Sequence, residues 1–458
     1  MPRMSFLRGD ADARTIFLMV TISSWSDCEI IVIKIMIKLQ VPMQTEKYDL
    51  AIIGGGPAGM MAAVRASECA ARVVLLEKNH VPGVKLLMTG KERCNITHFE
   101  TDIRSFAAVF GKNGKFLLSA LSRFGMKETI DFFHKHNLNT KIEQDGRIFP
   151  ESDRAKDVQA LFLRLMKENN VTLLTGCRIK DIPCRQSAIE EIILDTNGVK
   201  AEKYLICTGG LSYPQTGSTG DGYSWAKQMG HTIIRPGPAL TPVAVKEKWV
   251  RELEGLSLNN VRISIYQNNK KQDERLGEAL FTGIGMSGPI ILDMSKSIGK
   301  LLAAGQAELF IDFIPDMDFH ALDERILRDL QKYNNRSIKN ILSELLPNKL
   351  VPVILELAKI DPGGKGSSIT KDERKRLRLL SKQFPLTIKN LSGFDKAIIT
   401  TGGIALKEID PKTMRSRIIN NLYFAGEILD LDGPTGGYNL QVCWSTGYIA
   451  GESAVSCI

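Results

Sequence analysis

Apolar residues of the chain gather in short runs that alternate with segments of helical composition, and residues 48–78 show this first. Leu50 to Ile53 is a short, β-branched apolar run, typical of a buried strand. An alanine- and methionine-rich segment follows, and Val73 to Leu76 is a second apolar run that ends at Glu77. This order predicts a strand, a helix and a second strand, the start of an α/β sheet.

Three glycines, Gly54, Gly56 and Gly59, lie between the first predicted strand and the helix in the order G-x-G-x-x-G. They permit a tight turn, a close backbone approach to a pyrophosphate and close helix–strand packing, while the helix N-terminus offers free N–H groups to phosphates. Glu77 follows at the spacing of an acid that accepts hydrogen bonds from a ribose and repels a 2′-phosphate. The pattern predicts an adenine dinucleotide with a free 2′-hydroxyl; the alternative is a glycine-rich turn in an ordinary α/β domain.

The hydrophobic pattern changes around Pro236 and returns to its first form near Lys396. Polar-interrupted strands precede a helical stretch rich in Lys, Glu and Leu between these two points. We expect a discontinuous nucleotide-binding domain at 47–238 and 390–458, an inserted domain at 239–389 with a β part (239–315) and a helical part (316–389), and an extension at 1–46 outside the fold.

The predicted extension contains two apolar segments, Thr15 to Ile22 and Glu29 to Val41, each too short to span a bilayer. No small-residue cleavage site of a signal peptide is evident. We expect that deletion of residues 1–42 leaves cofactor content unchanged, and a loss of cofactor would contradict this.

The composition is that of a soluble globular protein, with 458 residues, 43% hydrophobic, 24% charged and a formal charge of +9. The dense basic run Lys371 to Lys382 also carries leucines at helical spacing, so a solvated helix face is favoured over nucleic-acid binding. Eight scattered cysteines without a C-x-x-C pair predict a reducing, cytoplasmic location and no metal site. We expect no membrane partner.

Two further segments invite a chemical interpretation. Between residues 83 and 98, Lys85 and Arg93 can pair with phosphates, and Cys94 is either a nucleophile or, as the lack of a neighbouring histidine favours, a small residue packed beside a cofactor. A second G-x-G-x-x-G, Gly283 to Gly288, follows residues too polar for a buried parallel strand. We therefore expect a loop that turns into a helix there, rather than a second nucleotide fold.

Four motifs carry a family resemblance: GGGPAG at 54–59, TGxxRCNxT at 89–97, GRIFP at 146–150 and FAGEILDLDGPTGGYNLQ at 424–441. With them the chain resembles, from about Tyr48 to Ala454, the HI0933-like flavoproteins, also called YhiN/BaiN-type NAD(P)/FAD-dependent oxidoreductases. The resemblance implies FAD in a discontinuous Rossmann-like domain with an inserted β-barrel-like plus helical domain. Members usually carry glycines where this chain has Lys91 and Glu92, and a histidine at the position of Gly283.

Matched residue by residue, the resemblance implies that FAD contacts Gly54, Gly55, Gly56, Pro57, Ala58 and Gly59 at its pyrophosphate, Glu77 at the ribose, Ile179 at the adenine, Gly426 and Glu427 at the ribityl chain, Gly437, Tyr438, Asn439, Leu440 and Gln441 at the flavin ring, and Lys85, Leu86, Arg93, Cys94 and Asn95 elsewhere. We also expect contacts at Lys78 and at Gly209, because a predicted strand ends in Thr208-Gly209-Gly210, where backbone must come near a ligand. A helix N-terminus beside the ring also has a physical reason, since a reduced flavin is anionic near N1.

The leading functional hypothesis is a flavoenzyme in which FAD takes hydride from NAD(P)H and passes it to a small organic acceptor. A conjugated enone is a candidate acceptor, because some members are associated with reducing enones of bile-acid intermediates. FAD-dependent tRNA modification and a flavin-binding protein with little turnover are the alternatives. No side chain stands out as the general acid; Tyr438 and Tyr213 are candidates.

Overall fold

The computed structural model describes residues 4–6, 18–21, 32–35, 47–195 and 197–455, and divides the chain into two compact units, Met1–Glu46 and Lys47–Ile458. In the first unit, β1 (Met4–Phe6), β2 (Leu18–Thr21) and β3 (Val32–Ile35) form an antiparallel sheet in that order. The remainder of the predicted extension lies outside the described residues.

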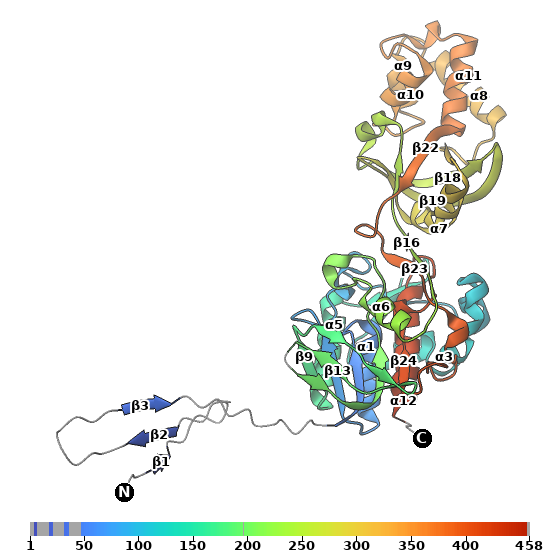
Figure 1. The fold of residues 1–458 in the computed structure, drawn as a ribbon. Coiled ribbons are helices and arrows are strands. Elements are labelled where there is room, and N and C mark those ends of the chain that lie inside the picture. The colour runs from blue at the N-terminus through green and yellow to red at the C-terminus, as the bar shows by residue number, and fades with distance from the viewer. Residues whose placement is uncertain (1–3, 7–17, 22–31, 36–46, 196, 456–458) are drawn as a thin grey trace. The chain divides into compact units, whose positions relative to one another are not determined.

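The second unit is built on a five-stranded sheet in the order β24-β15-β4-β5-β9, in which every neighbouring pair is parallel. Its strands are β4 (Tyr48–Ile53), β5 (Val73–Glu77), β9 (Thr172–Thr175), β15 (Ala201–Ile206) and β24 (Leu422–Phe424). The predicted apolar runs of β4 and β5 are buried, as expected for strands covered on both faces. The Rossmann-like fold class is therefore confirmed, and the C-terminal strand β24 completes the sheet beside β15 (Figure 1).

Helices α1 (Pro57–Glu68) and α12 (Tyr438–Ala454) pack backbone against backbone. A Cβ at Gly447 would lie 2.4 Å from the carbonyl oxygen of Ala58, and one at Gly451 would lie 2.5 Å from that of Ala62. The contacts follow the same order along both helices, so the helices run parallel. This packing fixes the C-terminal segment against the dinucleotide motif.

The other elements of the sheet domain are short and surround this core. They are η1 (Leu86–Met88), β6 (Thr97–His98), α2 (Ile103–Ala108), η2 (Gly111–Leu117), α3 (Leu118–Arg123), α4 (Met126–Lys135), β7 (Thr140–Ile142), β8 (Arg147–Pro150), α5 (Ala155–Glu168), β10 (Ile179–Asp181), β11 (Cys184–Arg185), β12 (Ala188–Ile189), β13 (Ile192–Leu194), β14 (Gly198–Val199), η3 (Pro214–Thr216), α6 (Asp221–Gln228), η6 (Leu406–Glu408) and η7 (Gly426–Ile428).

An antiparallel pair, β16 (Ile233–Ala239) and β23 (Ile399–Ile404), leads the chain into and out of the segment between them. That segment contains a closed barrel in the order β17-β20-β19-β18-β21-β22 and a group of helices. Its elements are β17 (Val243–Val245), η4 (Lys248–Leu253), β18 (Ser257–Gln267), β19 (Lys270–Thr282), β20 (Gly285–Ser287), α7 (Pro289–Ala304), β21 (Glu308–Asp312), α8 (Phe319–Lys332), α9 (Ile338–Leu342), α10 (Val351–Ala358), η5 (Gly366–Ser368), α11 (Lys371–Lys382) and β22 (Phe384–Leu391). Barrel and helices share a hydrophobic core separate from that of the parallel sheet.

The second glycine motif belongs to this barrel. Gly285–Ser287 forms β20, which pairs antiparallel with β17 and β19, and Gly288 is the N-cap of α7. The predicted turn into a helix is present, and the strand before it is antiparallel, unlike that of a nucleotide fold. In the part of the chain that the structure describes, no helix has the length and apolar character needed to cross a membrane.

Candidate functional site

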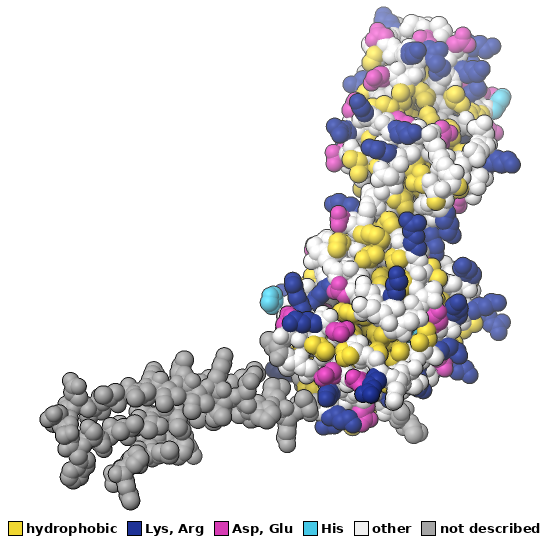
Figure 2. Space-filling view, in the orientation of Figure 1, with side chains coloured by type: hydrophobic (Ala, Val, Ile, Leu, Met, Phe, Trp, Pro, Cys, Tyr) yellow, Lys and Arg dark blue, Asp and Glu magenta, His cyan; other side chains and the backbone are white. Residues whose placement is uncertain are grey.

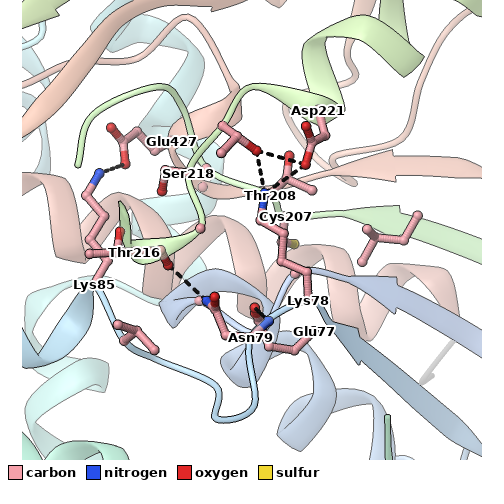
Figure 3. A pocket seen from close by; sticks show the side chains of 18 of the residues that line it. Glu77, Lys78, Asn79, Lys85, Cys207, Thr208, Thr216, Ser218, Asp221 and Glu427 are labelled. Atoms are coloured by element: carbon pink, nitrogen blue, oxygen red, sulfur yellow. Dashed lines mark hydrogen bonds and ion pairs between the residues drawn. The ribbon is translucent and has the colours of Figure 1, made fainter. Parts of the chain in front are cut away.

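A cavity of about 770 Å³ opens at the carboxyl ends of β4, β5 and β15. The strand order runs from β4 through β5 to β9 on one side, and from β4 through β15 to β24 on the other. Ligands of open α/β sheets bind at this kind of switch in strand order. Loop residues after each strand, the turn around η3, and Gly426 and Glu427 complete the wall (Figure 3).

The glycine turn leaves the first part of the cavity open to a phosphate. Gly54 has a φ of +102°, and a Cβ there would lie 2.6 Å from the Cys207 carbonyl oxygen; a Cβ at Gly59 would lie 2.0 Å from that of Gly54. A Cβ at Gly56 would meet nothing within 4 Å. No side chain caps the N-terminus of α1, so its free N–H groups are available to an anion.

Glu77 lies in the cavity wall with its side chain fixed by backbone groups. The amide of Gly55 donates to its Oε2 at 2.8 Å, and the amide of Asn79 donates to its Oε1 at 2.8 Å. Glu77 is only 8% exposed, so both bonds are shielded from water. Each oxygen keeps a further lone pair, and the carboxylate can still accept from a ligand hydroxyl.

The loop before α6 is tied across the same wall. The Lys78 ammonium lies 2.8 Å from an Asp221 carboxylate oxygen and also donates to the Thr219 hydroxyl. The Asn79 amide nitrogen donates to the carbonyl oxygen of Thr216 at 2.9 Å. Figure 3 shows these groups converging from two segments that are far apart in the sequence.

A partly buried polar network forms the opposite end of the cavity. Lys85 Nζ lies 2.7 Å from Glu427 Oε2, while Glu427 Oε1 accepts from the Thr400 amide at 2.8 Å and from the Ser212 hydroxyl at 3.0 Å. Ser212 and Thr400 are fully buried. The network therefore joins the segments after β5, β15 and β24 around one carboxylate.

The N-terminal turn of α12 is held by polar side chains. The side-chain nitrogen of Asn95 points to the carbonyl oxygen of Thr97. In this orientation the side-chain oxygen of Asn95 accepts a hydrogen bond from the backbone amide of Gly437 at 3.0 Å. The Asn439 side chain accepts from the Gly433 amide at 2.8 Å, and the Gln441 amide nitrogen points inward to the Thr129 hydroxyl at 2.8 Å. No side chain caps the helix itself.

Tyr438 is the first residue of α12. Its ring stacks on His98 with centroids 4.5 Å apart, and Phe106 packs against it at 4.9 Å. Burial, with the charges of Glu100 and Asp293, raises the pKa of the Tyr438 phenol, which therefore stays protonated at neutral pH.

Two residues expected at the cofactor have other contacts. The Arg93 guanidinium pairs with Glu143 at 2.5 Å and Asp153 at 2.6 Å, which raises its pKa, and lies 3.9 Å from the Phe149 ring centroid. Burial raises the pKa of the Cys94 thiol to about 12. Such a thiol is a poor nucleophile, so the interpretation as a small packed residue is the favoured one.

Some of the expected cofactor residues line the cavity, and the others lie outside its lining. Those that line the cavity are Gly54, Gly56, Pro57, Ala58, Glu77, Lys78, Lys85, Leu86, Ile179, Gly209, Gly426 and Glu427. Those outside its lining are Gly55, Gly59, Arg93, Cys94, Asn95, Gly437, Tyr438, Asn439, Leu440 and Gln441. Lining residues that the sequence did not single out include Asn79, Thr216, Ser218, Asp221 and Cys443. Thr216, Ser218 and Asp221 lie in the glycine-rich stretch after Thr208, and that stretch is the sequence feature that could have indicated them.

Comparison with known proteins places the chain among flavoenzymes. A model of the HI0933-like protein Rossmann domain matches residues 48–453. The 3-dehydro-bile acid delta(4,6)-reductase of Clostridium scindens is 33% identical over 88% of this chain and 98% of its own, and the ribosomal RNA dihydrouridine synthase of Escherichia coli is 29% identical over 90% and 99%. The 3-ketosteroid delta1-dehydrogenase structure from Sterolibacterium denitrificans shares the fold, with 13% identity, a TM-score of 0.51, and coverage of 90% of this chain and 100% of that one.

The fold and these relatives define the class: the protein is an FAD-dependent oxidoreductase. Within that class, the chain belongs to the HI0933-like family.

Proposed function

We propose that this enzyme reduces a carbon–carbon double bond conjugated with a carbonyl group, and that NAD(P)H supplies the hydride through bound FAD. The single observation that carries the proposal is the reaction shared by the two full-length relatives. The name of one describes reduction of unsaturated 3-dehydro bile acids, and that of the other describes saturation of the uracil ring in RNA. In both, the double bond is activated by a carbonyl, which makes its distal carbon a hydride acceptor.

The cavity supports a definite direction for FAD. The pyrophosphate fits at the N-terminus of α1, where Gly56 leaves space, and the adenosine ribose fits at Glu77. Ile179, which also lines the cavity, would meet the adenine. Lys85 and Glu427, at the other end, would border the ribityl chain.

The offset between the two parallel helices supports placing the flavin ring at α12. Ala58, the second residue of α1, faces Gly447, the tenth residue of α12. At 1.5 Å per residue, the N-terminus of α12 extends about 12 Å beyond that of α1. One helix N-terminus would therefore serve the pyrophosphate, and the second would lie further along the cofactor, where the positive end of its dipole stabilises negative charge on the ring.

The protein's part in the reaction would be to orient the acceptor, to exclude water and to deliver a proton. Bound FAD supplies the hydride chemistry. Of the two candidate tyrosines, Tyr438 lies at the start of α12 and keeps its phenolic proton at neutral pH, so we prefer it as proton donor.

A visible spectrum of the purified protein and an anaerobic titration with NADH and NADPH test the donor. We expect a yellow protein whose flavin is bleached rapidly by at least one nicotinamide and reoxidised by a conjugated enone. A colourless protein that takes up no added FAD would overturn the proposal. A flavin that neither nicotinamide reduces would overturn the donor assignment.

Reduction of uridine in RNA is the second candidate function. The dihydrouridine synthases of Escherichia coli and Haemophilus influenzae match this chain over 99% and 96% of their own lengths, so the similarity is not confined to the cofactor domain. This similarity supports a nucleic-acid partner, which the charge pattern of the sequence had disfavoured. Mass spectrometry of ribosomal RNA from cells with and without the protein separates the two candidates. If the substrate is RNA, dihydrouridine is present in the first sample and missing from the second; if it is a small enone, the two samples are the same.

A further inference from the structure

A second cavity lies in the surface of the sheet domain, and its lining shares no residue with the first. Its volume is about 330 Å³, and its walls come from η2, η6 and residues 409–417. This is near the lower end of the size range of ligand pockets, about 300–1,000 Å³, and suits one nucleotide unit better than a whole dinucleotide.

The lining of this cavity carries three cations, Lys112, Lys407 and Arg417, and no carboxylate. Both lysines are exposed, and within the described residues neither forms an ion pair. Arg417 donates through Nε to the Ile409 carbonyl oxygen at 3.4 Å, which directs the guanidinium while leaving its other N–H groups available. Three cations in a lining that has no carboxylate favour the binding of an anion.

Glu408 and Asp410, which adjoin lining residues in the sequence, accept hydrogen bonds from backbone amides, whereas Asp430 lies close enough to act on Lys112. Glu408 accepts from the Thr232 amide at 2.8 Å, and Asp410 accepts from the Lys412 amide at 2.8 Å. Asp430 accepts from the Asn113 side chain at 3.1 Å, and its charge acts on Lys112. Asp430 therefore offsets part of the positive charge of Lys112 and leaves that of Lys407 and Arg417.

An apolar wall stands beside the cations. Phe116 and Leu406 are half-buried, so part of each faces the cavity, and Ile409 forms its buried floor. Proteins commonly bind a nucleotide by pairing its phosphate with cationic side chains and by stacking its base on an aromatic side chain. This cavity offers both kinds of contact.

The cavity is also connected to the segment expected at the flavin. The Asn113 side chain donates to the Asp430 carbonyl oxygen at 2.7 Å, and the Asp430 amide donates to the Ile404 carbonyl oxygen at 3.1 Å. Asp430 lies between Glu427 and the N-terminus of α12, so a ligand bound here would act on residues next to the proposed ring site.

We propose that this cavity binds a phosphate-bearing nucleotide unit of a ligand of the enzyme, with the phosphate at Lys407 and Arg417 and the ring against Phe116. The ligand is either the nicotinamide dinucleotide or the RNA, which share this chemistry. The choice of these two ligands rests on the proposed function. The cavity and its positive charge are observed independently of that function.

The test compares FAD-loaded wild-type protein with the double variant Lys112→Gln, Lys407→Gln. Both side chains are exposed, so folding and FAD absorbance should be unchanged. The matched control is Lys371→Gln, Lys375→Gln, which removes two exposed cations from α11. Dissociation constants for NAD⁺, NADP⁺ and a short single-stranded RNA are measured by calorimetry at low and moderate salt, because the oxidised dinucleotides bind without reducing the flavin. Arg417→Gln serves as a second, independent variant.

We expect the cavity variants to weaken binding of at least one probe by about tenfold or more, with a smaller salt dependence, while the control stays within twofold of wild type. Weakening confined to the dinucleotides identifies the hydride donor as the ligand, and weakening confined to RNA identifies the nucleic acid. Unchanged affinity for all three probes in both cavity variants overturns the proposal. A flavin that no nicotinamide reduces would contradict the proposed donor alone, since the RNA measurement still decides the site.

Discussion

At the scale of single residues, Glu77 is the most direct test of the cofactor site. Its carboxylate is fixed by the amides of Gly55 and Asn79, ready to accept from a ribose hydroxyl. Hydrogen bonds to a charged group contribute about 1.5–3 kcal/mol, so Glu77→Ala should weaken FAD binding on the order of 10- to 100-fold. Glu77→Gln keeps the shape and should weaken it less. The quenching of FAD fluorescence on binding measures both.

The control for this change is Glu202→Ala, which removes an exposed carboxylate from β15. Its FAD affinity should equal that of wild type. Equal affinity in Glu77→Ala and wild type would remove Glu77 from the ribose site.

The loop that contains Lys91 and Glu92 stores backbone strain. Their φ values are 56° and 67°, in the left-handed region that favours glycine, the residue that the family resemblance implies at these positions. A side chain there costs about 1–2 kcal/mol, whereas glycine costs about 0.5–1 kcal/mol through the entropy of the unfolded chain. Lys91→Gly and Glu92→Gly should therefore leave the free energy of unfolding unchanged or raise it by up to about 1 kcal/mol. Lys91→Val should lower it, because β-branched residues tolerate this region least.

Urea unfolding of the three variants measures these changes. Both side chains are exposed, so few contacts are lost with them. Destabilisation of a glycine variant by more than about 1 kcal/mol would show that the replaced side chain makes stabilising contacts.

At the scale of elements, the contact between α1 and α12 leaves no room for a side chain. Gly447→Ala would place a Cβ 2.4 Å from the Ala58 carbonyl oxygen and force the helices apart. Overpacking of this kind costs about 1–3 kcal/mol. We expect that loss in the free energy of unfolding, together with weaker FAD binding, because the separation moves one helix N-terminus relative to the other.

Gly393→Ala is the matched control, since its Cβ would meet nothing within 4 Å and its φ lies outside the left-handed region. It should be neutral or slightly stabilising. Thermal unfolding and FAD titration of both variants check the pair. Equal behaviour of Gly447→Ala and Gly393→Ala would contradict the close helix contact.

The sequence pattern predicted those helices and strands that are determined by their own residues. The strand, glycine turn, helix and strand of residues 48–77 are all in the structure, because each depends on its own residue types. Strand β19 was not predicted, since its exposed face is polar and only its antiparallel partners define it. Arg93 shows the same limit at a site: its partners Glu143 and Asp153 lie far away in the sequence, and only the fold brings them together.

At the scale of the whole molecule, the barrel and its helices have a hydrophobic core of their own, distinct from that of the parallel sheet. No residue between Leu240 and Ile398 belongs to the hydrophobic core of the sheet domain. Ala239 pairs directly with Ile399 in the antiparallel stem, so a tight Asn-Gly turn can replace residues 241–397 and close the stem as a hairpin.

We expect the shortened chain to fold and to retain FAD, as judged by its visible spectrum, but to lose reduction of the acceptor. Its FAD affinity should fall somewhat, because Thr435 loses its bond to Asp293 and Asp432 loses its pair with Lys296. The full-length variant Asp293→Asn, Lys296→Gln separates that loss from the loss of the barrel, and it should retain turnover. A shortened protein that is insoluble or free of FAD would show that the sheet domain depends on the inserted barrel. Acceptor reduction at the full-length rate would instead place the whole substrate site on the sheet domain.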